Sequence, residues 1–402
     1  MTIELRGAEP DQWDLVFDRV VRAFHATDAP EERDAWRAVF ELDRLTTAWD
    51  GDDLVGTAGL HSFRMTLPGG ALLDTAGVTM VTVQPTHTRR GILTSMMRRQ
   101  LDGLRDGGEP VAILTASEPG IYGRFGYGVA THELRGSIDT TRVAVTAPEG
   151  ADAVRLRLVA PADPEVVAAC EAVYAELVPG RAGMLARRPH WEQRTVVDAP
   201  AVRRGAGPLV CVLAEVDGQV RGYARYAVAR PAVVLRDIAA LDPAVHAALW
   251  RYLCRIDLTD AVSFDNLPLD DALLHLVSDE RRCALTRYDS LHLRLVDVGA
   301  ALAARTYSAP VDVVLDVTDA FCPWNAGRWH LTGDSTGATC ERTTAPADLA
   351  LDTKHLAAAY LGGPTLHSLA TAGLLHPLHP TALPPTSLAF HTTPTPWLPH
   401  GF

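Results

Sequence analysis

A basic turn that contains a glycine is the first stretch with residue types suited to chemistry. In VTVQPTHTRRGILTSMM, residues 81–97, an apolar strand ends before Pro85, which bars further strand pairing, and Gly91 opens a helix. The first turn of a helix offers unpartnered backbone N–H groups and the positive end of the helix dipole, so an anion binds well there. Arg89 and Arg90 add positive charge beside it. The spacing matches neither the dinucleotide nor the P-loop glycine pattern. We therefore predict a pyrophosphate site, with an ordinary strand-to-helix connection as the alternative.

The end of the chain is the second unusual stretch. PTPWLPHGF, residues 394–402, has no Asp, Glu, Lys or Arg, but three prolines, a tryptophan and a terminal phenylalanine. Chain ends are usually poorly ordered. Here Trp397, Leu398 and Phe402 can bury their side chains, and the prolines reduce the entropy lost on ordering. We expect a docked tail that holds its α-carboxylate in a fixed place. The alternative is that the tail merely packs on the last region of the chain.

Helix and strand patterns divide the chain that must position these stretches into three regions. Residues 1–148 have mixed α/β patterning, with two strands that turn at Asp50-Gly51 and a helix between two further strands. Residues 149–288 repeat that order more weakly, which predicts an internal duplication. Residues 289–402 combine strands with short helices. From residue 376 onward, where proline and histidine are frequent, we expect no regular element.

Composition excludes several classes of function. The net charge of -12 and a pI near 5.6 argue against nucleic-acid binding, which usually needs a basic face. The sequence has no run of 18 apolar residues, so no membrane span is predicted, and the N-terminal segment lacks the apolar core of a signal peptide. We therefore expect a cytoplasmic protein. The six cysteines form no Cys-x-x-Cys pair and the histidines no ligand spacing, so no metal is predicted.

The glycine turn resembles the cofactor motif of the GCN5-related N-acetyltransferases (GNAT), in which Arg/Gln-x-x-Gly-x-Gly/Ala follows a strand. Thr88 and Leu93 depart from that motif. Because main-chain amides make most of the phosphate contacts, we expect the site to survive. The resemblance implies acetyl-coenzyme A as cosubstrate and no metal. The residues it implies for cofactor binding are Val81, Thr82, Val83, Arg89, Arg90, Gly91, Ile92, Leu93, Thr94, Ser117 and Glu118.

A second stretch, ASEPGIYGRFGYGVAT at residues 116–131, resembles the Tyr-x-x-x-Gly-Phe/Tyr element of the same superfamily. The first tyrosine there often protonates the departing thiolate, so the resemblance implies Tyr122 as the general acid. A phenol with a pKa of about 10 is a plausible acid for a thiolate with a pKa of about 8.5. The alternative is that Tyr122 only packs beside the cofactor. Tyr127 is the competing tyrosine, and we interpret it as a core residue.

Both stretches resemble in sequence the corresponding stretches of the Eis (enhanced intracellular survival) subfamily, whose members have about this length. The resemblance implies a catalytic GNAT domain over residues 1–148, a degenerate GNAT-like domain over 149–288 and a domain like sterol carrier proteins over 289–402. In this subfamily the α-carboxylate of a terminal phenylalanine is the general base, and Phe402 matches. A backbone N–H near Val83 is the expected oxyanion donor. A homo-oligomer, usually a hexamer, is also implied.

Members of that subfamily acetylate amines of aminoglycosides and lysine side chains. The resemblance therefore implies that the acceptor is a primary amine, either on an aminoglycoside-like small molecule or on a lysine-bearing peptide. Aminoglycoside resistance would follow from the first. The residues implied for substrate binding are Phe24, Asp28, Trp36, Met80 and Trp191. Ala26 and Gly401 stand where better-known members carry acids. Acetylation of an amine is therefore the stronger expectation. The alternative is a non-catalytic binding protein, with a degenerate GNAT fold and a last domain that holds an apolar ligand or a partner.

Overall fold

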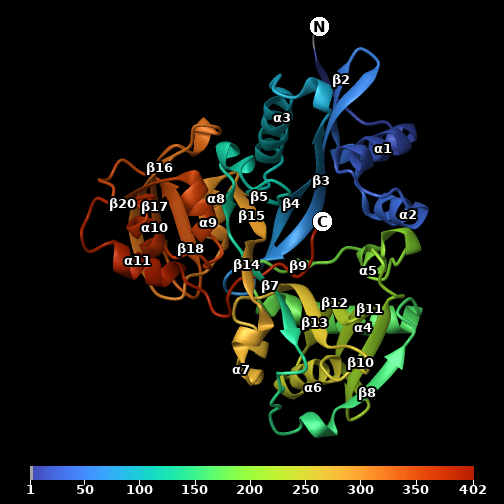
Figure 1. Cartoon of the computed structure of the whole chain (residues 1–402). Helices are drawn as coiled ribbons and strands as arrows, with labels where there is room; N and C mark the ends of the chain where they lie inside the picture. The colour runs from blue at the N-terminus through green and yellow to red at the C-terminus, as the bar shows by residue number, and fades with distance from the viewer. Residues whose placement is uncertain (1–2) are drawn as a thin grey trace.

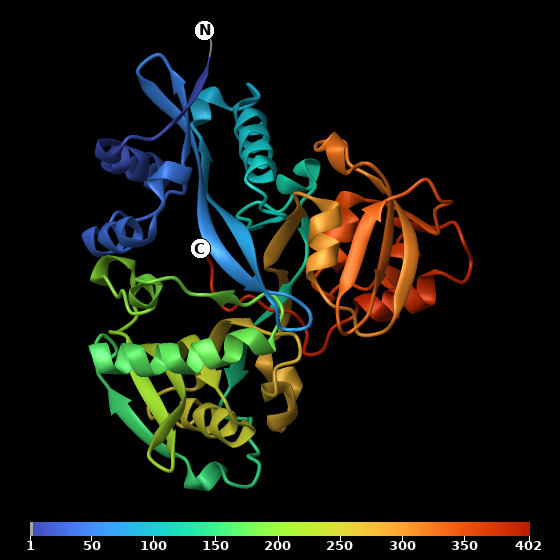
Figure 2. The same cartoon turned by 180° about the vertical axis from the view of Figure 1, so that it is seen from behind.

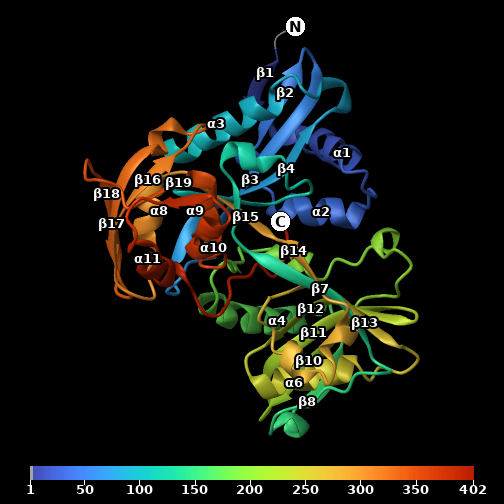
Figure 3. The same cartoon turned by 60° about the vertical axis from the view of Figure 1, so that its left-hand side comes forward.

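The computed structural model describes residues 3–402, which form three sheets, with the C-terminal residue near the centre of the molecule (Figure 1). The first sheet is mainly blue to cyan, the second green to yellow and the third orange to red, so each comes mainly from one successive part of the chain. Figure 2 and Figure 3 show from two further sides that the C terminus lies near the centre of the molecule. The mixed α/β fold class is confirmed.

The first sheet carries the glycine turn. Its strands are β1 (Glu4–Gly7), β2 (Thr46–Asp50), β3 (Asp53–Thr66), β4 (Leu72–Val83), β5 (Val111–Thr115), β6 (Gly128–Val129), β9 (Leu185–Ala186) and β15 (Leu291–Leu295). They pair in the order β1-β2-β3-β4-β5-β15-β6, and β9 pairs with β3. The hairpin predicted at Asp50-Gly51 is confirmed, because β2 and β3 pair up to Asp50 and Asp53.

Three helices cover this sheet: α1 (Trp13–Ala23), α2 (Pro30–Val39) and α3 (Ile92–Asp106). Figure 1 shows α3 on one side of the strands and α1 and α2 on the other. The predicted start of α3 after Gly91 and its end before Gly107 are confirmed. Met97, Leu101 and Leu104 recur at helical spacing on its buried face, which is why this stretch folds as a helix against the sheet.

The second sheet has the strands β7 (His132–Asp139), β8 (Arg155–Val159), β10 (Val210–Val216), β11 (Gln219–Ala229), β12 (Ala232–Ala240), β13 (Ala261–Leu267) and β14 (Thr286–Asp289). Its helices are α4 (Pro164–Leu177), α5 (Trp191–Arg194), α6 (Pro243–Leu253) and α7 (Leu273–Leu276). The strands pair in the order β14-β7-β13-β12-β11-β10-β8.

The predicted internal duplication is confirmed by the order of the elements. The run β2-β3-β4-α3-β5 in the first sheet is repeated as β10-β11-β12-α6-β13 in the second, and β4–β5 and β12–β13 are both parallel pairs. The two copies also exchange a strand: β7 pairs with β13, whereas β15 pairs with β5. The domain boundaries at 148/149 and 288/289 stay a prediction, since the first sheet takes β9 and β15, and the second sheet takes β7, from beyond their own segments.

The third sheet has the strands β16 (Val311–Thr318), β17 (Gly327–Gly333), β18 (Ala338–Arg342), β19 (Leu349–Asp352) and β20 (Leu375–Pro377), in the order β18-β17-β16-β19-β20. Its helices are α8 (Val298–Ala304), α9 (Thr353–Ala359), α10 (Leu366–Thr371) and α11 (Leu383–Phe390). The expectation of no regular element from residue 376 onward is wrong, because α11 forms there. Pro384 and Pro385 lie in its first turn, where a missing N–H removes no helical hydrogen bond.

A buried arginine lies in the core of the third sheet. Arg305 is 1% exposed, and its guanidinium donates to the carbonyl oxygens of Tyr360 and Phe390, the second at 3.0 Å. The rings of Tyr307 and Phe390 pack with centroids 5.2 Å apart beside it. This part of the core is therefore filled by packed rings and by an arginine that bonds to main-chain carbonyl oxygens. No helix among residues 3–402 is long and apolar enough to cross a membrane.

Candidate active site

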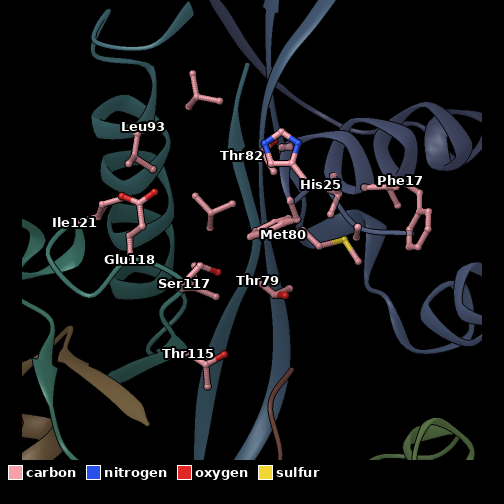
Figure 4. A pocket seen from close by; sticks show the side chains of 18 of the residues that line it. Phe17, His25, Thr79, Met80, Thr82, Leu93, Thr115, Ser117, Glu118 and Ile121 are labelled. Atoms are coloured by element: carbon pink, nitrogen blue, oxygen red, sulfur yellow. The ribbon is translucent and has the colours of Figure 1, made fainter. Parts of the chain in front are cut away.

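A cavity of about 1280 Å³ lies in the first sheet, between α3 and the helices α1 and α2. Figure 4 shows its two walls, with Leu93 and Glu118 on one side and Met80 and His25 on the other. Two further parts of the cavity wall come from distant parts of the chain, namely Phe402 and the segment 201–204. That segment belongs to the second lobe, which is the second sheet with the helices and loops between β8 and β14. The cavity is therefore completed by residues from beyond the first sheet.

One end of the cavity is suited to an anion. Gly91 has φ +80 and Arg89 has φ +64, so this turn alternates into the left-handed region that brings successive backbone N–H groups to one side. No side chain caps the first turn of α3, and a Cβ on Gly91 would meet no atom within 4 Å among the described residues. The open N-terminus of a 15-residue helix is thus available to a phosphate group.

Most of the residues expected to bind the cofactor line this cavity. They are Val81, Thr82, Val83, Arg89, Gly91, Ile92, Leu93, Thr94, Ser117 and Glu118. Arg90 is not among the lining residues: its side chain is half exposed and lies 3.9 Å from Asp50. The geometry brings the two cofactor stretches of the sequence together at one site.

The middle of the cavity is a separation between two neighbouring strands. Strands β4 and β5 pair only at Ala76–Ala112 and Gly77–Ile113, and within residues 3–402 they diverge beyond these pairs. A bulge lies on β4 at Met80, which has φ +49 and whose carbonyl oxygen accepts a hydrogen bond of 2.7 Å from the Thr57 hydroxyl. The β4 edge from 78 to 83 lines the cavity, so its main-chain groups can bind an extended ligand.

Tyr122 lines the cavity from the short helix Tyr122–Phe125. Burial and the nearby charge of Glu118 raise the pKa of Tyr122 to about 12, so the phenol keeps its proton at neutral pH. The ring of Tyr127 lies 5.9 Å from that of Tyr122, but Tyr127 is 1% exposed and packs in the core under the cavity, which confirms its interpretation as a core residue.

The tail is docked, as predicted, and its last residue lines the same cavity as Tyr122. The Phe402 ring packs edge-to-face on Phe63, with centroids 4.9 Å apart, and a Cβ on Gly77 would meet the Phe63 ring at 2.5 Å and the Phe402 ring at 2.9 Å. Glycine at position 77 therefore leaves space that both rings fill. Figure 1 shows the red C-terminal segment running from the third sheet to this point.

Three of the residues expected to bind the acceptor line the cavity: Phe24, Trp36 and Met80. Trp191 does not line it. It is 4% exposed and packs edge-on against Trp36, with centroids 6.3 Å apart, so it supports the cavity wall from behind.

Asp28 is also not among the lining residues. Its carboxylate accepts a hydrogen bond of 2.6 Å from Arg33, and the same guanidinium bonds Asp14 and Asp18, so the charge of Asp28 is already paired. The acid that lines the cavity near Trp36 is Glu32, in the first turn of α2.

Sequence reasoning missed Glu32, Arg194 and Arg204. Arg194, from α5, lies 3.7 Å from the Glu32 carboxylate, and Arg204 lines the cavity from the segment 201–204. No local pattern marks these contacts, because they join parts of the chain that are far apart in sequence. Within residues 3–402, no group of three or more His, Cys, Asp or Glu is placed as metal ligands would be.

Comparisons with known proteins agree with this geometry. Residues 4–130 and 183–295 each match a family described as an acetyltransferase (GNAT) domain, and residues 298–399 match a sterol carrier protein domain. The chain is 57% identical to an uncharacterized N-acetyltransferase of Streptomyces avermitilis, with 100% of both chains covered. It is 35% identical to the N-acetyltransferase Eis of Mycobacterium tuberculosis, with 93% of each covered. The crystal structure of Eis1 from Mycobacterium abscessus is similar with a TM-score of 0.84 and 33% identity, covering 100% of both chains.

Proposed function

The chain belongs to the Eis acetyltransferases of the GNAT superfamily, and we propose that it transfers the acetyl group of acetyl-coenzyme A directly to a primary amine. The acceptor is a small molecule or a lysine side chain. The observation that supports this most strongly is that Tyr122 and the terminal Phe402 line one cavity, together with the open start of α3. A proton donor and a carboxylate can then act on one bound thioester.

The residues that would hold acetyl-coenzyme A fit the group. Backbone N–H groups at Gly91–Thr94 and the side chain of Arg89 would bind its pyrophosphate at the start of α3. The gap between β4 and β5 would hold its extended arm, with main-chain groups of residues 78–83 as hydrogen-bond partners. When bound, acetyl-coenzyme A supplies the acetyl group as a thioester.

Tyr122 acts as the general acid in this proposal. Its raised pKa keeps the phenol protonated, so it can give its proton to the sulfur as the C–S bond breaks. A main-chain N–H on the β4 edge, near Val83, stabilises the negative charge that develops on the carbonyl oxygen.

The α-carboxylate of Phe402 acts on the acceptor amine. Its fixed position lets it accept a hydrogen bond from the amine and orient it toward the acetyl carbon. A carboxylate with a pKa of about 3.5 is a weak base for an ammonium of about 10, so the proton leaves through water or after partial desolvation has raised the basicity of the carboxylate.

Charge near Trp36 favours an acceptor with a single positive charge on an apolar frame. The guanidinium of Arg194 offsets the charge of Glu32, and Arg204 adds a further positive charge at the edge of the cavity. A molecule with several ammonium groups therefore gains less from this site than from one lined by unpaired acids. Aminoglycosides and lysine-bearing peptides are kept as acceptors to be tested.

The alternative of a non-catalytic binding protein is disfavoured. The curated relatives described above are named N-acetyltransferases, and the buried Arg305 fills part of the third sheet's core. The hexamer and the cytoplasmic location implied by the resemblance stay predictions, the first of which light scattering can check.

The test is an assay of thiol release from acetyl-coenzyme A with four acceptors: an aromatic monoamine, a linear polyamine, an aminoglycoside and a lysine-bearing peptide. We expect turnover with at least one amine, with kcat/KM highest for the monoamine. The proposal is wrong if no amine is acetylated and coenzyme A also fails to raise the melting temperature of the protein.

A further inference from the structure

The duplicated sheets contain two equivalent points where neighbouring parallel strands separate. In the first sheet the last β4–β5 pair is Gly77–Ile113, and Thr115 lies two positions further along β5. In the second sheet the last β12–β13 pair is Leu235–Phe264, and Asn266 lies two positions further along β13. Asn266 therefore has the same position in the second sheet as Thr115 has in the first. Thr115 lines the cavity described above.

The tail of the chain joins these two points. Its end lies at the first, where the Phe402 ring packs over Gly77 and an ideal Cβ on Gly401 lies 4.0 Å from the Thr115 hydroxyl oxygen. Trp397 and Leu398 lie at the second, in contact with Asn266. The point of strand separation that lines the cavity in the first copy thus has, in the second copy, a residue that bonds the protein's own tail.

Asn266 holds the tail with both ends of its side-chain amide. Its Nδ2 donates to the carbonyl oxygen of Leu398 at 3.0 Å, and its Oδ1 accepts from the indole N–H of Trp397 at 2.7 Å. Its backbone has φ +99, a conformation that a residue with a Cβ rarely adopts, and it sits at a register shift in β13. Strain of this kind persists where the surrounding structure requires it and is concentrated at functional positions.

Further contacts from the same lobe fix the neighbouring tail residues. Asp270 accepts the backbone N–H of Thr395 at 2.7 Å, and Arg181 donates to the Thr395 carbonyl oxygen at 3.0 Å. The backbone N–H of Trp397 donates to the carbonyl oxygen of Ala182 at 2.9 Å. The tail is therefore bonded to the second lobe at Thr395, Trp397 and Leu398 before it reaches the cavity.

We propose that the second GNAT copy serves as the receptor of the tail, and that Asn266 is a positioning residue for the Phe402 carboxylate. This rests on the proposed function, in which that carboxylate takes part in acetyl transfer. Asn266 touches neither substrate nor cofactor and acts only through the tail. It fixes the register of the tail four residues before its end, so that the carboxylate reaches the first sheet at one position.

The test compares Asn266→Gly and Asn266→Asp with the unaltered enzyme. Glycine removes the amide without adding strain at φ +99. Aspartate keeps the acceptor for the Trp397 indole but replaces the donor to Leu398 with a carboxylate oxygen. Asp265→Asn, an exposed neighbour on the same strand, is the matched control. Two quantities are measured: the rate at which a carboxypeptidase releases Phe402, and kcat and KM for acetyl-coenzyme A.

We expect both Asn266 variants to release Phe402 faster and to lose about tenfold to hundredfold in kcat, with KM for acetyl-coenzyme A within threefold, while Asp265→Asn matches the unaltered enzyme. Faster release without loss of kcat would overturn the positioning role, and unchanged release and kcat would overturn the receptor as well. If an Asn266 variant does not fold, Asp270→Ala is measured in its place, with the same expectations.

Failure of the proposed function gives a different result. If the unaltered enzyme stays fully active after carboxypeptidase has removed Phe402, the carboxylate has no part in catalysis. The release rates of the Asn266 variants still report whether the second lobe holds the tail, because that measurement does not depend on acetyl transfer.

Discussion

The guanidinium carbon of Arg194 lies 3.5 Å from the centre of the Trp36 ring, so an arginine from the second lobe covers one face of an aromatic residue that lines the cavity. Burial lowers the pKa of Arg194 to about 10, and Glu32, 3.7 Å away, opposes that effect. Arg194 is therefore charged at neutral pH. Its guanidinium already makes the cation–π contact with Trp36 and the ion pair with Glu32. A second ammonium group of a substrate would otherwise make these two contacts.

We predict that Arg194→Met changes acceptor preference. Methionine keeps an apolar side chain on Trp36 but frees the carboxylate of Glu32, so kcat/KM for a diamine relative to a monoamine should rise about fivefold, as for one exposed ion pair. Arg188→Met is the control, because Arg188 is half exposed and pairs with Glu41 outside the cavity. An unchanged ratio in Arg194→Met would count against the charge argument.

Tyr122→Phe should separate turnover from cofactor binding. Loss of the proton donor should lower kcat by about 10²–10⁴, the range for general acid catalysis, and leave KM for acetyl-coenzyme A within threefold. Tyr127→Phe removes a hydroxyl that has no hydrogen-bond partner within residues 3–402, and it should leave kcat unchanged. Normal turnover in Tyr122→Phe, or equal losses in both variants, would refute the assignment of the acid.

The pH dependence of the unaltered enzyme tests the same assignment from another side. Because the pKa of Tyr122 is raised to about 12, its protonated form persists throughout the accessible alkaline range. Up to pH 10, kcat of the unaltered enzyme should therefore not fall through ionisation of Tyr122. Any decrease in that range should also be present in Tyr122→Phe. An alkaline fall near pH 9 that depends on Tyr122 would contradict the raised pKa.

Two glycines of one helix region give a matched test of the anion site. Gly91→Ala strains a backbone with φ +80 at the start of α3, at a cost of about 1–2 kcal/mol, and should raise KM for acetyl-coenzyme A. Gly103→Ala, in the interior of α3 with open space around its Cβ position, should stabilise the protein by about 0.5–1 kcal/mol and leave KM unchanged. Equal KM values in the two variants would argue against the site.

His61 makes the fold sensitive to acid. It is 1% exposed, neither ring nitrogen has a hydrogen-bond partner within the described residues, and burial lowers its pKa to about 4. As pH falls below the unfolded value of about 6.5, the unfolded chain binds the proton first, so stability is lost between pH 6.5 and 4.

The loss attributable to His61 is about 3 kcal/mol, since each pKa unit corresponds to about 1.4 kcal/mol. His61→Leu should remove it while stability at pH 7 stays within about 1 kcal/mol, as denaturant titrations at pH 7 and 4.5 can measure. Part of the acid sensitivity should remain, because burial also lowers the pKa of His400, to about 3. Identical acid sensitivity in His61→Leu and the unaltered protein would contradict this, because it would mean that the pKa of His61 is the same in the folded and unfolded states.

The parts of the fold and site that the sequence predicts are those coded by neighbouring residues. The helix that begins after Gly91 and the hairpin at Asp50-Gly51 each depend on a short run of residue types, and both are confirmed. The docking of Phe402 was also predictable, because an apolar tail without charged side chains needs a place to bury.

What the sequence did not predict depends on contacts between distant segments. The pairing of Glu32 with Arg194 and the exchange of β7 with β15 leave no local pattern, since each needs the two lobes to be placed against one another. Helix α11 is not predicted for a different reason: frequent proline argues against a regular element, whereas two prolines in a first turn favour a helix.

The most direct test of the central claim replaces the α-carboxylate of Phe402 with an α-carboxamide by joining a synthetic C-terminal peptide to the rest of the chain. This change keeps the terminal ring on Phe63 and every tail contact described above, and removes only the charge. We predict that kcat falls by at least about 10², while KM for acetyl-coenzyme A and the melting temperature are unchanged. Full activity in the carboxamide enzyme would contradict the account.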